Sequence, residues 1–190
     1  MRRELKYVLF TFLGILLLPI VAVTVITHTG IDEISDQLVS VDSKTKAIQL
    51  YYPNGKPYKL FTAKVALPAK GVYTNEFGAS LPPYYLFHSG MDIAGKKGDP
   101  ITTFMPGKVI YAGEIFWGFG KHVIVDHGDN ITSLYGHLDK ITVQNGQEVK
   151  PGDVIGLEGS TGWSTGPHLH FEIRVFGIPV NPNIFIERNP

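Results

Sequence analysis

The sequence Ser160-Thr-Gly-Trp-Ser-Thr-Gly-Pro-His168-Leu-His170-Phe-Glu172 places two histidines at positions i and i+2 among apolar and β-branched residues, which is typical of a β-strand. Side chains two apart on a strand leave the same face, about 6.6–6.8 Å from one another. Both imidazoles can therefore reach one site in different roles: one can bind a metal while the other transfers protons. Gly159, Gly162 and Gly166 predict a loop that approaches this site closely.

A second segment, His88-Ser-Gly-Met-Asp92, offers further metal-binding side chains. On a straight strand, residues i and i+4 lie about 13 Å apart, too far to share one ion. The chain must therefore bend between His88 and Asp92, and Gly90 can adopt the backbone angles that a bend requires. Two neutral histidines and one carboxylate are the ligand set of a catalytic zinc site, which keeps a fourth position open for water.

The combination of segments carries more weight than any single histidine. A lone histidine is most often a hydrogen-bonded surface or core residue. Here three glycine-flanked segments follow in order: His88-Ser-Gly-Met-Asp92, Tyr135-Gly136-His137-Leu138 and Gly166-Pro-His168-Leu-His170-Phe-Glu172. Their joint occurrence predicts one composite site.

In these segments the chain resembles the lysostaphin-like (LytM-type) zinc metallopeptidases of bacterial cell walls. The resemblance runs from about Val72 to Pro182 and is supported by Phe77-Gly78 and Gly107-Lys-Val-Ile. It departs from the family pattern in one respect, because no arginine follows the Phe77-Gly78 pair. This departure concerns the wall of the cleft and not the metal-binding set.

By position, the resemblance implies that Zn²⁺ is bound by His88, Asp92 and His170, and that His137 and His168 are the unliganded catalytic pair. It further implies an endopeptidase that hydrolyses stem-peptide or cross-bridge bonds of peptidoglycan. Either histidine of the pair can be the general base, and the sequence leaves this open.

Other polar and aromatic residues near these segments are expected to have supporting roles. We expect Glu172 to orient His170 rather than act as a base, and His127 to be structural. We expect His28 and His122 to be bystanders. A set of aromatic residues near the motifs is expected either to wall a substrate groove or to take part in ordinary packing: Tyr84, Tyr85, Phe87, Phe116, Trp117, Phe119 and Trp163.

The sequence allows two alternative functions that do not involve peptide-bond cleavage. A catalytically silent relative would bind the wall or activate another hydrolase, but such relatives typically lose metal ligands, which this chain retains. A lipoyl- or biotin-carrier domain shares the pattern of Gly146 to Gly156, but no exposed lysine motif of a carrier accompanies it.

Composition excludes other classes. Seventeen basic residues balance seventeen acidic ones, so nothing favours nucleic acid as a partner. The absence of cysteine excludes disulfides and thiolate metal sites. The chain length of 190 residues suits one globular domain with an appendage.

The N-terminal region predicts a membrane anchor. Residues 1–6 are basic, and residues 7–27 contain no charged side chain. About 20 helical residues cross the hydrocarbon layer, so residues 7–27 are expected to span the membrane with residues 1–6 in the cytoplasm. The alternative is a cleaved signal peptide, although Ala22-Val-Thr is a poor cleavage site. The remainder would then face the cell wall or periplasm.

The rest of the chain predicts a tether followed by an all-β domain. Residues 28–70 are expected to form a tether, with either a short amphipathic helix or solvated chain at Ile31–Ser43 and an extra hairpin around Pro53-Asn-Gly55. Residues 71–187 show short glycine-punctuated strands, which predict a glycine-rich antiparallel sheet or barrel-sandwich with a duplicated motif. The duplication shows in two copies of a turn-strand unit: Gly98-Asp-Pro-Ile followed by Pro106-Gly-Lys-Val-Ile, and Gly146-Gln-Glu-Val followed by Pro151-Gly-Asp-Val-Ile.

Overall fold

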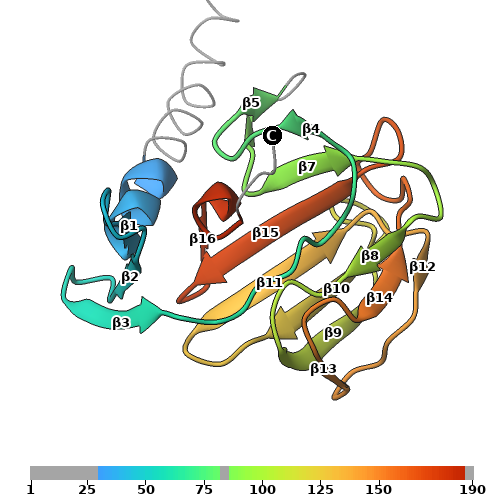
Figure 1. Ribbon diagram of the computed structural model, residues 1–190. Coiled ribbons are helices and arrows are strands. Elements are labelled where there is room, and N and C mark those ends of the chain that lie inside the picture. Colours follow the sequence, from blue (N-terminus) through green and yellow to red (C-terminus); the bar gives the residue numbers. More distant parts are fainter. Residues whose placement is uncertain (1–29, 82–85, 187–190) are drawn as a thin grey trace, which may run out of the picture.

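The computed structural model describes residues 30–81 and 86–186 and consists mainly of antiparallel β-sheets (Figure 1). The strands are β1 (Val39–Val41), β2 (Ile48–Tyr51), β3 (Pro57–Phe61), β4 (Val72–Asn75), β5 (Ser80–Leu81), β6 (Leu86–Phe87), β7 (Met91–Ala94), β8 (Pro100–Thr102), β9 (Gly107–Glu114), β10 (Lys121–Asp126), β11 (Ile131–Gly136), β12 (Lys140–Ile141), β13 (Glu148–Val149), β14 (Val154–Leu157), β15 (Leu169–Val175) and β16 (Ile178–Val180). Residues 30–38 are helical, and a 3₁₀ turn, η1, spans Pro182–Ile184. The prediction of an antiparallel all-β fold is confirmed.

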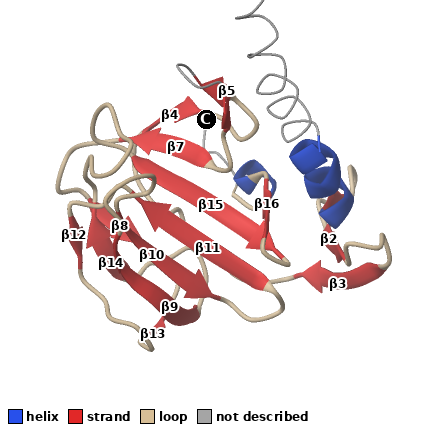
Figure 2. Cartoon of the chain, turned by 180° about the vertical axis from the view of Figure 1, so that it is seen from behind, coloured by secondary structure: helices blue, strands red, loops and turns tan. Residues whose placement is uncertain are grey.

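The principal sheet has eight strands in the order β13-β9-β10-β11-β15-β7-β4, with β16 paired to β15. The smaller sheet β12-β14-β8 lies over the β9–β10 end of it (Figures 1 and 2). The core gathers fully buried side chains from both sheets, among them Ile101, Val123 and Ile155, together with Leu138 from the connection between β11 and β12. Close packing of these apolar side chains holds the two sheets together.

The side chains of strand β15 point alternately to the apolar core and to a polar face of the sheet. Leu169, Phe171, Ile173 and Val175 are buried in the apolar core. His170 and Glu172 alternate with them and therefore leave the opposite face. A single strand thus anchors the core and presents polar groups for chemistry.

The strands of the two predicted turn-strand units pair with each other across the two copies. The first copy supplies β8 and β9, and the second supplies β13 and β14. Strand β8 pairs with β14, whereas β13 pairs with β9. Each copy therefore contributes one strand to each sheet. The finer prediction of a duplicated barrel-sandwich stays a prediction.

Residues before the principal sheet pack against it. The helix at residues 30–38 ends at Leu38 and not near Ser43, because Val39–Val41 pairs with β2 as a strand. Strands β2 and β3 form the hairpin expected around Pro53-Asn-Gly55. Aromatic contacts join it to the C-terminal part of the domain: the ring centroids of Phe61 and Phe185 are 5.0 Å apart.

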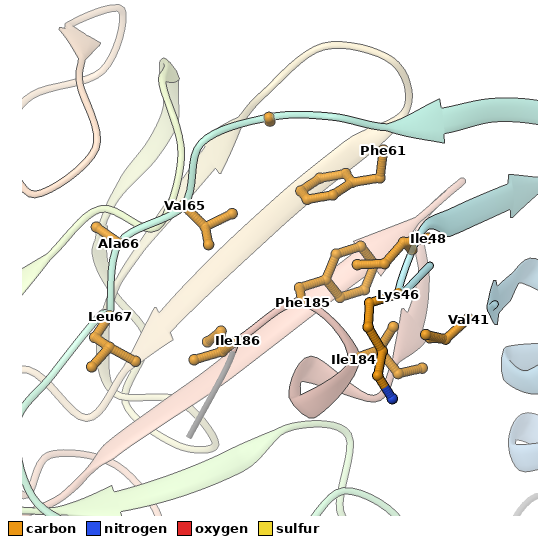
Figure 3. Close-up of a pocket in the computed structure, with 11 residues that line it drawn as sticks. Val41, Lys46, Ile48, Phe61, Val65, Ala66, Leu67, Ile184, Phe185 and Ile186 are labelled. Carbon is orange, nitrogen blue, oxygen red and sulfur yellow. The ribbon is translucent and has the colours of Figure 1, made fainter. Parts of the chain in front are cut away.

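A groove of about 650 Å³, lined mainly by apolar side chains, runs between residues 41–67 and the C-terminal residues 184–186 (Figure 3). Its lining includes Val41, Phe61, Leu67 and Ile184, with Lys46 as a charged member. None of the histidines predicted to carry chemistry lines it. The groove is therefore separate from the candidate site.

Membrane anchoring lies outside what the structure describes. The predicted membrane-spanning segment, residues 7–27, belongs to the part of the chain that is not described. Among the described residues, no helix has both the length and the apolar character needed to cross a membrane.

Candidate active site

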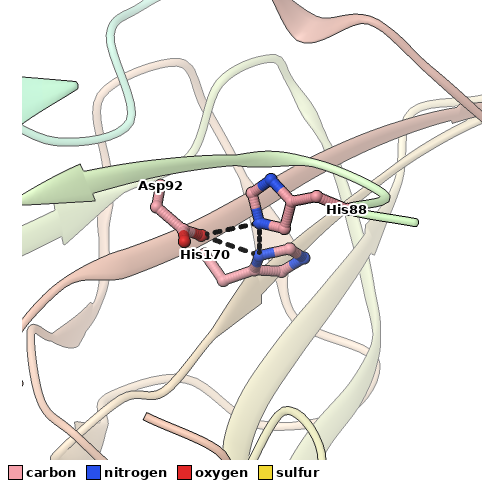
Figure 4. A group of neighbouring side chains, drawn as sticks. All are labelled: His88, Asp92 and His170. Carbon is pink, nitrogen blue, oxygen red and sulfur yellow. Dashed lines mark hydrogen bonds and ion pairs between the residues drawn. The ribbon is translucent and has the colours of Figure 1, made fainter. Parts of the chain in front are cut away.

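The three predicted metal-binding side chains, His88, Asp92 and His170, meet at one buried point, on strands β7 and β15 and the loop before β7 (Figure 4). Asp92 and His170 are direct partners across the β7–β15 ladder, so both leave the same face of the sheet. His88 Nε2 lies 3.0 Å from Asp92 Oδ1 and 3.0 Å from His170 Nδ1. The third side of this triangle, from His170 Nδ1 to Asp92 Oδ1, measures 2.9 Å.

The bend that brings His88 toward Asp92 depends on Gly90 for a different reason than the sequence suggested. Gly90 does not have a positive φ, so no left-handed backbone is needed there. Instead, a Cβ atom at this position would lie 2.3 Å from the carbonyl oxygen of Phe171. Glycine is required because the bend presses its backbone against β15.

Hydrogen bonds on the far side of each imidazole determine which nitrogen faces the centre. His88 Nδ1 donates to the carbonyl oxygen of Glu76 at 2.8 Å, since a carbonyl can only accept. His170 Nε2 donates to Glu172 Oε1 at 3.2 Å. In their neutral forms, both imidazoles therefore direct a lone pair at the point where Asp92 also presents an oxygen.

This convergence of three acceptors demands a positive charge. Burial lowers the pKa of His170, but hydrogen bonds and charges from Asp92 and Glu172 outweigh it and raise the pKa to about 9. Burial raises the pKa of Asp92, yet hydrogen bonds from His170 and His88 hold it well below its usual range. Either a proton or a bound cation satisfies the three atoms, and nitrogen and oxygen donors in this number suit Zn²⁺.

Glu172 contacts His170, Ser89 and Arg174 and orients the imidazole of His170. It is fully buried and accepts hydrogen bonds from Ser89 Oγ and, at 2.7 Å, from Arg174 Nε. Burial raises the pKa of Glu172, but His170 and Arg174 more than compensate, so its pKa is lowered. The expected orienting contact with His170 is present, and an ionised Glu172 increases the basicity of that imidazole.

The two remaining predicted histidines flank the triangle. The ring centroids of His137 and His168 are 4.7 Å apart, and His168 Nε2 lies 3.8 Å from Asp92 Oδ2. His137 Nδ1 donates to the carbonyl of Thr161, and His168 Nδ1 donates to that of Gly166, each at 2.8 Å. Both therefore keep Nε2 available as a base when neutral.

His137 has two unusual properties. Its φ of 63° is left-handed, which is uncommon for a residue with a side chain and is concentrated at functional sites. Burial lowers its pKa, and the nearby His170 and His168 lower it further, to about 4. His137 is therefore unprotonated at neutral pH.

Several contacts at the site were not anticipated from the sequence. Asn75 Nδ2 donates to Asp92 Oδ2 at 2.8 Å, which turns Oδ1 toward the two histidines. Phe119 stacks on His170, with ring centroids 5.4 Å apart. The alternation of Glu172 and Arg174 on β15 could have indicated their pairing, whereas the contacts of Asn75 and Phe119 depend on tertiary structure.

The other histidines that the structure describes, His122 and His127, contact residues outside the triangle. His127 uses both ring nitrogens in structural hydrogen bonds, with Pro106 O at 2.9 Å and Ser133 Oγ at 2.7 Å, as expected of a structural residue. His122 stacks on Tyr111 at 4.5 Å. His28 lies outside the described residues.

The aromatic residues considered for a groove behave differently from one another. Phe87 packs edge-to-face on Phe77, with centroids 5.0 Å apart. Phe116, Trp117 and Trp163 are exposed. Tyr84 and Tyr85 lie outside the described residues.

The chain is similar in sequence to curated bacterial proteins. Murein hydrolase activator NlpD of Escherichia coli is 44% identical over 115 residues, covering 60% of this chain and 29% of that protein. DD-carboxypeptidase/endopeptidase Mpg of Neisseria meningitidis is 39% identical over 117 residues, covering 58% and 27%. The chain thus matches less than a third of the length of these curated relatives.

Solved structures share the fold. A zinc-containing peptidase from Vibrio cholerae superimposes with a TM-score of 0.60 at 31% identity, covering 78% of this chain and 48% of that one. The catalytic domain of lysostaphin from Staphylococcus simulans gives 0.56 at 31% identity, covering 60% and 91%. The model of peptidase family M23 matches residues 86–182, which include β7, β15 and all five predicted site residues. The chain therefore belongs to peptidase family M23.

Proposed function

We propose that this protein is a zinc-dependent endopeptidase that hydrolyses peptide bonds of peptidoglycan. The observation that carries the proposal is the meeting of three lone-pair donors, His88 Nε2, Asp92 Oδ1 and His170 Nδ1, beside two further imidazoles. Bound to these atoms, Zn²⁺ would supply a water of lowered pKa and a positive charge for the scissile carbonyl.

The chain's own residues would supply the proton transfers. His137 and His168 each have Nδ1 fixed as a donor to a backbone carbonyl, which leaves Nε2 to accept a proton. One of them takes the proton of the attacking water at Nε2 and passes it to the leaving amine, and the other, when protonated at Nε2, donates a hydrogen bond to the oxyanion. The geometry is compatible with either assignment.

Two relatives support different versions of this function. The name of Mpg describes a carboxypeptidase and endopeptidase, which supports peptide-bond hydrolysis. The name of NlpD describes an activator of murein hydrolases, so a non-cleaving activator is the second candidate. The presence in one cluster of all five side chains that we propose to act in catalysis favours the enzyme.

Peptidoglycan cleavage can be tested on purified full-length protein in detergent. We expect zinc-loaded protein to release new amino groups from at least one wall type in a panel of different cross-bridges. A chelator should stop the release, and added zinc should restore it. Cleavage that persists after verified metal removal would contradict the zinc mechanism. If no wall type is cut, while a separate wall hydrolase is stimulated by the protein, the activator function replaces the enzyme.

We further propose that the protein acts from the membrane. The proposal divides the chain into a cytoplasmic tail at residues 1–6, a spanning helix at 7–27, a connecting region at 28–70 and the peptidase domain at 71–187. It is supported by the basic start and the uncharged segment that follows.

Protease treatment of intact, wall-stripped cells tests this topology. We expect the domain to be digested from outside while an N-terminal epitope tag stays protected and in the membrane fraction. A cytoplasmic marker protein must remain intact as the control. A mature soluble product beginning between Thr24 and Thr29 would instead show that the segment is a cleaved signal peptide.

A further inference from the structure

Three exposed aromatic side chains gather on two loops beside the histidine cluster. Phe116 and Trp117 lie between β9 and β10, and Trp163 lies between β14 and β15. Their exposed fractions are 95%, 60% and 59%. The rings of Trp117 and Trp163 are 6.1 Å apart and inclined by 51°. Adjacent exposed aromatics of this size typically mark a binding surface.

The loops that carry these rings are fixed to one another. The Trp163 N–H donates to the carbonyl of Gly118 at 2.8 Å. A Cβ on Gly162 would lie 2.3 Å from that same carbonyl oxygen, so the backbones are in direct contact. Thr161 Oγ1 adds a bond from the Lys121 N–H at 2.9 Å. The aromatic surface is therefore preorganised, which reduces the entropy lost on binding.

The same loops are continuous with the proposed catalytic groups. Thr161 accepts the Nδ1 hydrogen bond of His137 through its carbonyl, two residues before Trp163. Phe119, two residues after Trp117, stacks on His170. A polymer whose peptide lies at the histidines can therefore reach the aromatic surface with an adjoining part.

The chemistry of the loops selects among possible ligands. Residues 115–120 and 159–168 contain no Asp, Glu, Lys or Arg. Their polar side chains other than His168 are hydroxyls, of which Ser160 and Thr165 are exposed. Anionic lipid headgroups and charged stem peptides would call for ionic partners. Flat aromatic faces with neighbouring hydroxyls instead match a neutral sugar ring, which has an apolar C–H face and a hydroxyl rim.

We propose that Phe116, Trp117 and Trp163 form a subsite for an amino-sugar ring of the peptidoglycan glycan strand. The inference rests on the proposed function in taking the wall polymer as the ligand, and it assigns the sugar next to the cleaved peptide as a second recognition element. The protein would then bind glycan strands that carry no peptide at all.

The chain contains two tryptophans, and both lie on this surface, so intrinsic emission reports on it directly. Titrating full-length protein in detergent with peptide-free glycan strands should produce a saturable change in tryptophan emission. Trp117→Leu, which keeps an apolar side chain but removes the flat face, should weaken binding about fivefold or more, as should Phe116→Ala. Trp117→Phe should retain most of the affinity.

Leu60→Ala is the matched control, since Leu60 is 53% exposed on β3 and should leave binding unchanged. Unchanged emission, or equal binding by Trp117→Leu and the parent, would overturn the proposal. A response only to stem peptides would assign the surface to peptide, and one only to liposomes would assign it to membrane. Binding by chelated protein separates the two proposals, because glycan binding needs no metal whereas hydrolysis does.

Discussion

Replacing any one of His88, Asp92 and His170 by alanine should remove the bound zinc from the purified protein. Each side chain contributes one of three donor atoms that lie within 4.8 Å of one another, and two donors cannot hold the ion in place. The loss of affinity should exceed the roughly 10–100-fold that removal of an outer hydrogen-bond partner causes. Metal analysis of dialysed protein measures the stoichiometry.

His127→Ala is the matched control for this experiment, because His127 is a partly buried histidine that bonds to Pro106 and Ser133 instead of the triangle. Folding of each variant is checked by circular dichroism. Full zinc occupancy in a folded His88→Ala, Asp92→Ala or His170→Ala protein would remove that residue from the ligand set. Loss of zinc from His127→Ala in a folded state would show that the effect is not local.

Substituting His137 or His168 should separate metal binding from catalysis. Each variant should retain zinc and fold yet lose about 10²–10⁴-fold in turnover, the usual contribution of a general acid or base. His137→Asn is preferable to alanine at this position, since asparagine tolerates the left-handed backbone at φ 63°. Turnover is followed as amino groups released from peptidoglycan.

Two outcomes would change the assignment of these histidines. Loss of zinc with either variant would make that residue a metal ligand. Unchanged cleavage with both variants would mean that proton transfer uses other groups. If instead the parent protein stimulates a separate hydrolase and both variants do so equally, the activator function applies.

Much of the architecture follows from local sequence. Strand β15 was predicted from the alternation of His170 and Glu172 with apolar residues, because that period places one set in the core. The hairpin of β2 and β3 followed from its turn residues. By contrast, the sequence left a helix or a solvated chain open over Ile31–Ser43, whereas the helix ends at Leu38 because Val39–Val41 pairs with β2, which is a tertiary effect.

The sequence identified which residues form the candidate site, but it predicted little of how they are arranged. The glycine-flanked segments identified the residues, yet only the register of β7 against β15 places Asp92 opposite His170. Asn75 escaped notice because its bond to Asp92 crosses from β4 to β7. The lone-pair directions of His88, His137 and His168 depend on backbone carbonyl acceptors, which cannot be identified from the side chains in the sequence.

The alternation along β15 also acts as a check on correct assembly. A slip of one residue in its pairing would carry His170 into the apolar core and Phe171 onto the polar face, so the core and the metal triangle would fail together. A misregistered chain would therefore lack both stability and hydrolytic potential. For a protein proposed to cut the polymer that keeps its own cell intact, this coupling means that chemistry becomes available only to chains that have folded correctly.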